Sequence, residues 1–201
     1  MLAMKLTKID AAEANIIAAV RLHLEGGHPA PVLVLANSAR EVVATIGQKT
    51  GAETVHAAVA ANLGRTVQET IAPISKAAGF LKHADRQMTE SVELNERDVE
   101  IALYLACLDF GIVAGGLPIE AQIYEAWLIA KGVEKVSAMP LRGQKLIRSL
   151  IQHFPGIRSA NAAAQKKLGL EALQKAKSDP SLEMTIQRDV GQIIADRKKS
   201  A

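Results

Sequence analysis

The chain has 201 residues, of which 49% are hydrophobic, 22% are charged and only 3% are aromatic. This apolar fraction is typical of a globular domain and excludes a largely disordered chain. A single cysteine excludes a disulfide framework and a zinc site built from thiolates. No apolar run reaches the roughly 18 residues that a membrane span needs, and residues 1–10 contain no apolar h-region that would suggest secretion. We therefore expect a soluble, cytoplasmic protein that does not enter a membrane.

The charge is distributed unevenly along the chain. Residues 1–139 carry twelve basic and sixteen acidic side chains, a net charge of −4, whereas residues 140–201 carry twelve and five, a net charge of +7. We therefore expect a helical core over 1–139 and a basic helical extension over 140–201, packed on the core or on a partner subunit. A basic extension beside an acidic body favours a homodimer, and RNA or another nucleic acid is the alternative partner.

The first predicted elements are two helices joined by a short link. Asp10 and, three residues later, Glu13 form a possible capping pair that opens the first helix, and the glycines at 26 and 27 end it. Pro31 suits the first turn of the second helix, which should stop near Gly47. Such a short connection predicts an antiparallel helical hairpin.

The rest of the chain also shows helical periodicity, with capping residues and glycines at the predicted ends. Polar residues over 84–94 predict a surface loop, and no segment has a convincing strand pattern. The further predicted helices cover residues 52–63, 67–83, 96–114, 119–131, 142–154, 159–177 and 182–199. The sequence therefore predicts an all-α fold, a bundle of about six to eight helices with a basic helical extension.

Metal-binding and cofactor-binding motifs are weak in this sequence. Glu53 and His56 have the Glu-x-x-His spacing of di-metal bundles, but one such pair among many glutamates is expected by chance. We therefore predict no metal site, with His56 as a partly exposed helix residue. Glycines at 111, 115 and 116 follow no strand and precede no phosphate-binding lysine, so no cofactor is implied. Cys107 lies in an apolar run and is predicted to be a core residue.

A more specific polar cluster lies at the end of the predicted helix 67–83. It contains Lys82, His83, Asp85 and Arg86. The two cations could bind an anionic ligand such as a nucleotide, while Asp85 could orient His83 or pair with Arg86. Alternatively, the cations complement the dipole of the helix C-terminus and Asp85 bonds locally.

A second candidate pair is Arg148 and His153, five positions apart on a predicted helix. Five residues correspond to an angular offset of about 140°. The two side chains could therefore border one pocket, above all across a two-fold dimer interface. There Arg148 could stabilise phosphate charge while His153 removes a proton from a ribose hydroxyl. The alternative is an exposed pair on an amphipathic helix.

The opening hairpin, from IDAAE at 9–13 to SARE at 38–41, and the segment FLKHADR at 80–86 resemble an uncharacterised family of bacterial helical proteins. The arrangement of that family is similar to HEPN-type domains, and the resemblance covers approximately residues 9–131. It implies an HEPN-like core. Many HEPN domains are metal-independent ribonucleases with an Arg-x(4–6)-His motif, and others bind nucleotides or act only as partners. Arg148 and His153 match that motif in letters, beyond the resembling region.

Three functions follow from these observations. Because the sequence contains no convincing catalytic set, we expect a non-enzymatic, homodimeric helical module that binds a partner or small ligand. The first alternative is an HEPN-type metal-independent ribonuclease that acts as a toxin or defence component. The second is a protein that binds a nucleotide or another anionic small ligand through the cluster at 82–86.

Overall fold

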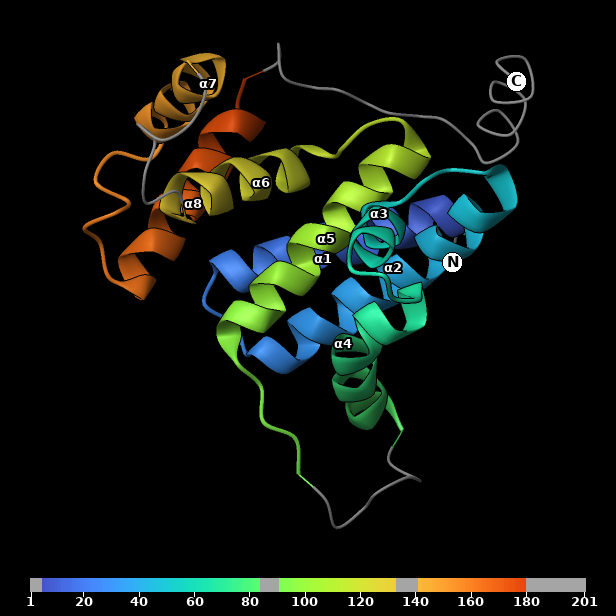
Figure 1. The fold of residues 1–201 in the computed structure, drawn as a ribbon. Helices are drawn as coiled ribbons and strands as arrows, with labels where there is room; N and C mark the ends of the chain where they lie inside the picture. The colour runs from blue at the N-terminus through green and yellow to red at the C-terminus, as the bar shows by residue number, and fades with distance from the viewer. Residues whose placement is uncertain (1–4, 84–90, 133–140, 180–201) are drawn as a thin grey trace.

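The computed structural model describes residues 5–83, 91–132 and 141–179. Over these residues the protein is all-α, with eight helices and no strand, which confirms the predicted fold class. The helices, shown in Figure 1, are α1 (Lys8–Leu24), α2 (Pro29–Thr50), α3 (Val55–Asn62), α4 (Val67–Lys82), α5 (Glu96–Ala114), α6 (Ile119–Gly132), α7 (Leu141–Gln152) and α8 (Ala162–Lys177). The helix predicted at 182–199 lies outside the described residues.

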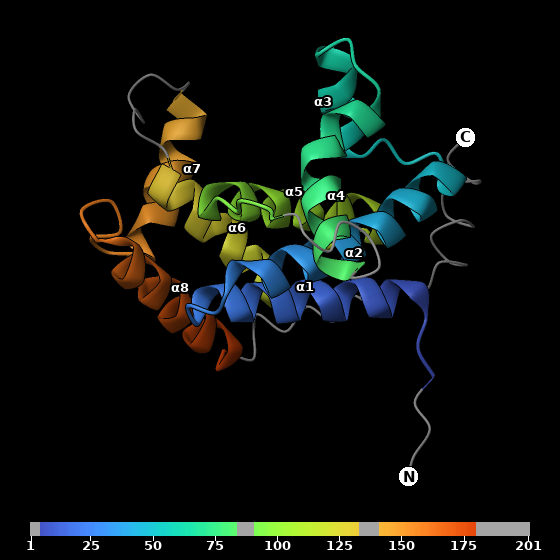
Figure 2. The same ribbon diagram turned by 90° about the horizontal axis from the view of Figure 1, so that it is seen from below.

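The centre of the molecule is formed by α1, α2 and α5. The first two helices form the predicted hairpin, and α5 packs against both (Figures 1 and 2). Small side chains allow these helices to approach one another closely, so that larger aliphatic groups interlock around them. The fully or almost fully buried alanines of this centre are Ala12, Ala19, Ala36, Ala39, Ala102, Ala106 and Ala114.

The second part of the core contains most of the large buried rings. Tyr124 and Trp127 of α6 are fully buried, as is Phe154, which follows α7. The indole Nε1 of Trp127 donates a hydrogen bond to the carbonyl of Gln165 on α8, at 2.7 Å. Phe154 and Leu173 belong to the same apolar core as the central helices. The segment after residue 140 therefore contributes to that core as far as the structure describes it.

Several predicted helix ends were wrong, and at two of them the predicted capping residue was not the one that the structure uses. The cap of α1 is Thr7 rather than Asp10: the Thr7 hydroxyl accepts from the Asp10 N–H, and the Asp10 carboxylate accepts from the Thr7 N–H. Helix α2 continues past Gly47 and ends at Gly51, whose φ is 69°. Gly47 instead allows α2 to pack closely against the Thr54 side chain, because an added Cβ would lie only 3.2 Å from it.

The helices α3 and α4 form a separate arm beside the centre, visible in Figure 2. Helix α4 begins with the predicted Thr66 cap, a full capping box with Glu69. It then contains Pro73, which has no N–H and therefore leaves the carbonyl four residues earlier without its helical donor.

None of the described helices combines the length and the apolar character that crossing a membrane requires.

Candidate functional site

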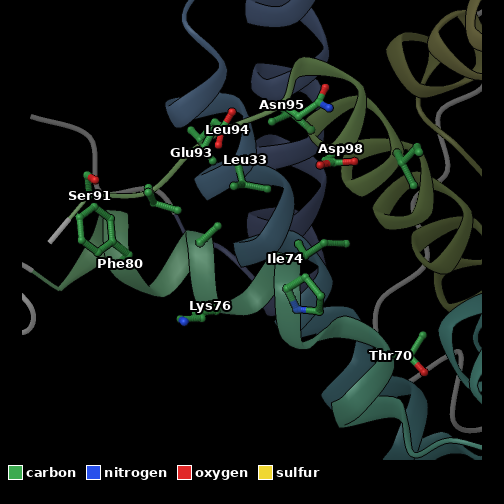
Figure 3. A pocket seen from close by; sticks show the side chains of 15 residues that line it. Leu33, Thr70, Ile74, Lys76, Phe80, Ser91, Glu93, Leu94, Asn95 and Asp98 are labelled. Carbon is green, nitrogen blue, oxygen red and sulfur yellow. The ribbon is translucent and has the colours of Figure 1, made fainter.

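A pocket of about 520 Å³ lies between α2, α4 and the beginning of α5 (Figure 3). The segment 91–95, which leads into α5, forms one of its walls. This volume falls within the range of about 300–1,000 Å³ that is usual for small-molecule sites. The apolar side chains that line the pocket include Leu33, Ile74, Ala77, Phe80, Leu94 and Val99.

Polar groups accompany this apolar surface. The polar lining residues are Thr70, Lys76, Ser91, Glu93, Asn95 and Asp98. Most of these side chains belong to exposed residues, so they form a rim around the apolar interior. Glu93 and Asp98 supply two carboxylates against the single ammonium group of Lys76. An apolar interior with a few polar groups suits a small molecule that has both kinds of surface.

Local sequence explains the two sides of the pocket. Asn95 caps α5, because its Oδ1 accepts a hydrogen bond of 2.9 Å from the N–H of Arg97. This cap fixes the point at which the segment 91–95 becomes helical. On the opposite side, Pro73 itself lines the pocket. The Asn95 cap therefore fixes the wall formed by the segment 91–95, and Pro73 is part of the wall formed by α4.

Two other hollows are shallower. One, of about 640 Å³, is mostly apolar and lies between α5, α6 and Leu150 of α7. The other, of about 800 Å³, lies between α1 and α2 and includes Glu41 and Lys49. Both are more open to solvent than the pocket beside α4. The pocket beside α4 is therefore the better candidate for holding a small ligand.

The polar cluster predicted at 82–86 is described only in part. Lys82 lies at the end of α4, with its Nζ 3.4 Å from the Glu41 carboxylate. His83 is exposed, and its backbone N–H donates to the carbonyl of Gly79. Asp85 and Arg86 lie outside the described residues. The anion site at Lys82, His83, Asp85 and Arg86 therefore stays a prediction.

Arg148 and His153 both lie on the surface. Arg148 is exposed on α7, and His153 is exposed just after the helix, where its N–H donates to the carbonyl of Leu150. Neither residue lines a pocket that we describe above. Their predicted role in a ribonuclease stays a prediction.

The expected exposure of His56 is wrong. Its side chain is buried, and its Nδ1 contacts the Asp109 carboxylate on α5. The other carboxylate oxygen accepts from the N–H of Val55 at 2.6 Å. Glu53 precedes α3 rather than sharing a helical face with His56, which removes the basis for a Glu-x-x-His pair.

Cys107, by contrast, is fully buried as predicted, and burial raises the pKa of its thiol.

A second buried polar group is Arg40 of α2. Its guanidinium donates to the Asn37 side-chain oxygen, at 2.8 and 3.2 Å, and to the Ser75 hydroxyl of α4, at 3.0 Å. Burial lowers the pKa of Arg40. The bond to Ser75 connects α4 to α2, while the bonds to Asn37 hold the guanidinium in place within α2.

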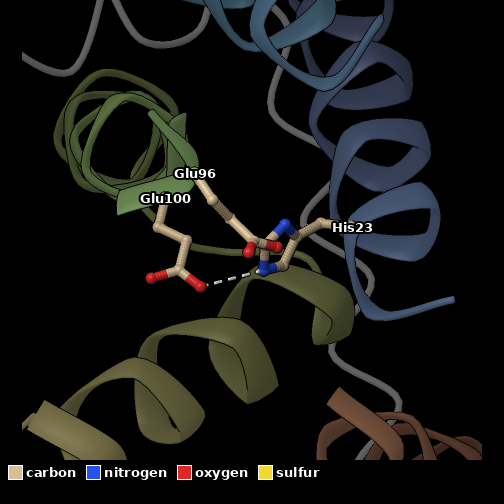
Figure 4. A group of neighbouring side chains, drawn as sticks. All are labelled: His23, Glu96 and Glu100. Atoms are coloured by element: carbon tan, nitrogen blue, oxygen red, sulfur yellow. Dashed lines mark ion pairs between the residues drawn. The ribbon is translucent and has the colours of Figure 1, made fainter. Parts of the chain in front are cut away.

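The third polar group joins α1 to α5 and is shown in Figure 4. It consists of His23, near the end of α1, and of Glu96 and Glu100 in the first turns of α5. The sequence does not predict this cluster, although Glu96 and Glu100 have the four-residue spacing that puts side chains on one helix face. His23 lies more than seventy positions earlier in the chain, so only the tertiary fold brings the three together.

Comparison with models of protein families, with curated proteins and with solved structures found no match to this chain.

Proposed function

We propose that this protein is a non-enzymatic helical binding module whose ligand occupies the pocket between α2, α4 and the start of α5. One observation carries the proposal: a hollow of about 520 Å³ combines an apolar interior with a polar rim. Burying the apolar part of a ligand there supplies affinity, at roughly 25 cal/mol per Å² removed from water. The rim then selects ligands by hydrogen bonding and charge.

The charges of the rim indicate the class of ligand. Glu93 and Asp98 carry negative charge, and Lys76 carries the opposing positive charge. This balance favours a small amphipathic molecule whose polar end is neutral or cationic. A nucleotide is disfavoured at this pocket because its phosphates would lie beside two carboxylates. The nucleotide alternative therefore belongs to the cluster at 82–86 and not to this pocket.

The test fills the pocket and measures binding of Nile red, a neutral amphipathic dye. Ala77 lines the pocket, so Ala77→Phe should occupy it and remove the fluorescence increase that the dye shows with the wild-type chain. Ala72 lies on the same helix, is exposed and does not line the pocket, so Ala72→Phe is the matched control. Equal dye binding by Ala77→Phe and wild type would contradict the proposal.

The proposal includes a homodimer, for which the outer face of α5 offers the most suitable surface. Ile101, Leu105 and Leu108 follow helical spacing there; Ile101, which also lines the edge of the pocket, remains 40% exposed, and the two leucines are partly exposed. Contiguous apolar surface of this kind commonly marks an interaction site. Sedimentation should therefore give a dimer for the wild type and a monomer for Leu105→Glu. A monomeric wild type would remove the dimer from the proposal.

The ribonuclease alternative has its own test, which is independent of the pocket. If Arg148 and His153 cleave RNA, His153→Ala should abolish the cleavage by purified protein without changing its helical content. Wild-type protein that leaves RNA intact would remove this alternative.

A further inference from the structure

Three side chains from two helices place metal-ligating atoms close together in the cluster of Figure 4. One atom each from His23, Glu96 and Glu100 lie within 4.8 Å of one another. Glu96 and Glu100 are one helical turn apart on α5, so their carboxylates project from one face. The His23 ring faces them from α1.

The His23 imidazole has an unsatisfied nitrogen that points into this cluster. The residue is only 2% exposed, and its Nε2 has no hydrogen-bond partner in the described part of the chain. That nitrogen lies 3.3 Å from Oε1 of Glu100, within ion-pair distance but without the geometry of a hydrogen bond. A buried polar atom without a partner destabilises the folded state unless something else binds it.

We propose that His23, Glu96 and Glu100 bind a divalent transition-metal ion of the Zn²⁺ type. One imidazole and two carboxylates form a mixed nitrogen and oxygen donor set that suits Zn²⁺ better than Mg²⁺. In a tetrahedral site with bonds of about 2.0–2.1 Å, neighbouring ligand atoms are about 3.3 Å apart. The separation of the His23 nitrogen and the Glu100 oxygen agrees with this geometry.

The ring of His23 is also held in a defined orientation. Its centroid lies 5.7 Å from that of Tyr124 and 5.5 Å from that of Trp127, both in edge-on arrangements. The Tyr124 hydroxyl donates to the backbone carbonyl of Glu100 at 3.0 Å, which ties α6 to the helix that carries the carboxylates. Packing of this kind fixes a ligand before the metal binds.

Two lysines already contact the carboxylates, so the metal must compete with them. Lys131 Nζ lies 2.5 Å from Oε1 of Glu100, and Lys166 pairs with Oε1 of Glu96. Two ammonium groups balance two carboxylates, and a divalent ion supplies the same positive charge. Lys131 also lies 4.2 Å from the centroid of the Trp127 ring, and this cation–π contact remains available when Glu100 binds the ion.

Calorimetric titration of the full chain with ZnCl₂ tests the site, and MgCl₂ is the reference ion. We expect one Zn²⁺ per chain and no heat with Mg²⁺. Glu96→Gln should weaken Zn²⁺ binding by at least about tenfold. Glu41→Gln is the matched control, since the Glu41 side chain is 52% exposed against 48% for Glu96 and also pairs with a lysine. Lys166→Met should strengthen binding, because it removes a competing ammonium group.

The remaining outcomes overturn the proposal. Wild-type protein that gives no Zn²⁺ heat has no such site. Equal Zn²⁺ affinity in Glu96→Gln and wild type would place the ion at other residues, for example the exposed His83 or His153. Weaker Zn²⁺ binding by Lys166→Met would contradict the claim that Lys166 and the metal compete for Glu96. The circular dichroism spectrum of Glu96→Gln should match that of the wild type, because Glu96 lies at the surface. A loss of Zn²⁺ binding then reflects the missing ligand and not unfolding. Binding of Nile red is measured separately, so failure of the metal site and failure of the ligand pocket are distinguishable.

Discussion

The carboxylate of Asp109 on α5 contacts the imidazole of His56 on α3, although the two residues are 53 positions apart. The same carboxylate accepts the N–H of Val55, the first residue of α3. Because α3 is only eight residues long, it has little stability of its own. Asp109 therefore attaches the beginning of α3 to the central helices.

We predict that Asp109→Ala destabilises the protein by about 3–5 kcal/mol, because two groups would lose the buried carboxylate that accepts from them, each at a cost of about 1–3 kcal/mol. The substitution would leave the His56 ring and the Val55 N–H without their buried acceptor. Urea unfolding measures the loss, and hydrogen exchange should show α3 losing protection first.

The control for this prediction is the exposed pair of Lys167 and Glu171 on α8, whose charged atoms are 3.9 Å apart. Lys167→Ala should change the free energy of unfolding by less than about 0.5 kcal/mol. If Asp109→Ala were as mild as this surface change, the buried contact would not stabilise α3.

A second prediction concerns stability in acid. Burial raises the pKa of Glu120, but hydrogen bonds from Lys177 and Arg21 outweigh it and leave the pKa below the ordinary value of 4.5. Such a carboxylate stabilises the fold above its unfolded pKa, and this contribution is lost as the pH falls through the lower folded pKa. The free energy of unfolding should therefore decrease below about pH 4.5.

Glu120→Gln should reduce this acid dependence and cost about 2 kcal/mol at pH 7, because it weakens charged hydrogen bonds of 2.7 Å from both Arg21 and Lys177. Urea unfolding across the acid range measures both effects. Burial also raises the pKa of Glu100, but the neighbouring His23 and Lys131 side chains outweigh it and lower that pKa, so some acid dependence will remain. An unchanged acid slope in Glu120→Gln would disprove the contribution of this residue.

Much of the fold could be predicted because helix signals are local. Thr66 and Asn95 cap the helices that the sequence predicted, and Gly115 ends α5 where expected. Gly47 was wrongly predicted to end α2, because sequence alone does not separate a glycine that ends a helix from one that permits close packing. The true end at Gly51 depends on a left-handed backbone conformation.

The buried polar contacts could not be predicted in the same way. His56 and Asp109, or His23 and Glu100, meet only after helices distant in sequence pack together. Helical periodicity assigns a polar residue to the solvent face by default, and His56 was therefore expected to be partly exposed. The pocket depends likewise on how α4 lies beside the segment 91–95, which no spacing within either segment encodes.

Gly169 lies where α8 approaches α1 and α6 closely. A Cβ at this position would lie 2.7 Å from Cδ2 of Leu24 and 2.9 Å from Cδ1 of Trp127. Both partners are buried, so neither has free space into which it can move. We predict that Gly169→Ala destabilises the protein by about 1–3 kcal/mol through overpacking. Replacing glycine by alanine inside a helix usually stabilises it. The sign of the change in the free energy of unfolding therefore tests whether α8 packs this closely.

Gly79 of α4 supplies the matched comparison, because a Cβ there would meet nothing within 4 Å. Gly79→Ala should stabilise the protein by about 0.5–1 kcal/mol, since alanine loses less backbone entropy in a helix. Urea unfolding of the two variants should thus give changes of opposite sign. If Gly169→Ala also stabilised the protein, α8 would not pack against Leu24 and Trp127 as closely as the structure shows. The segment after residue 140 would then contribute less to the common core.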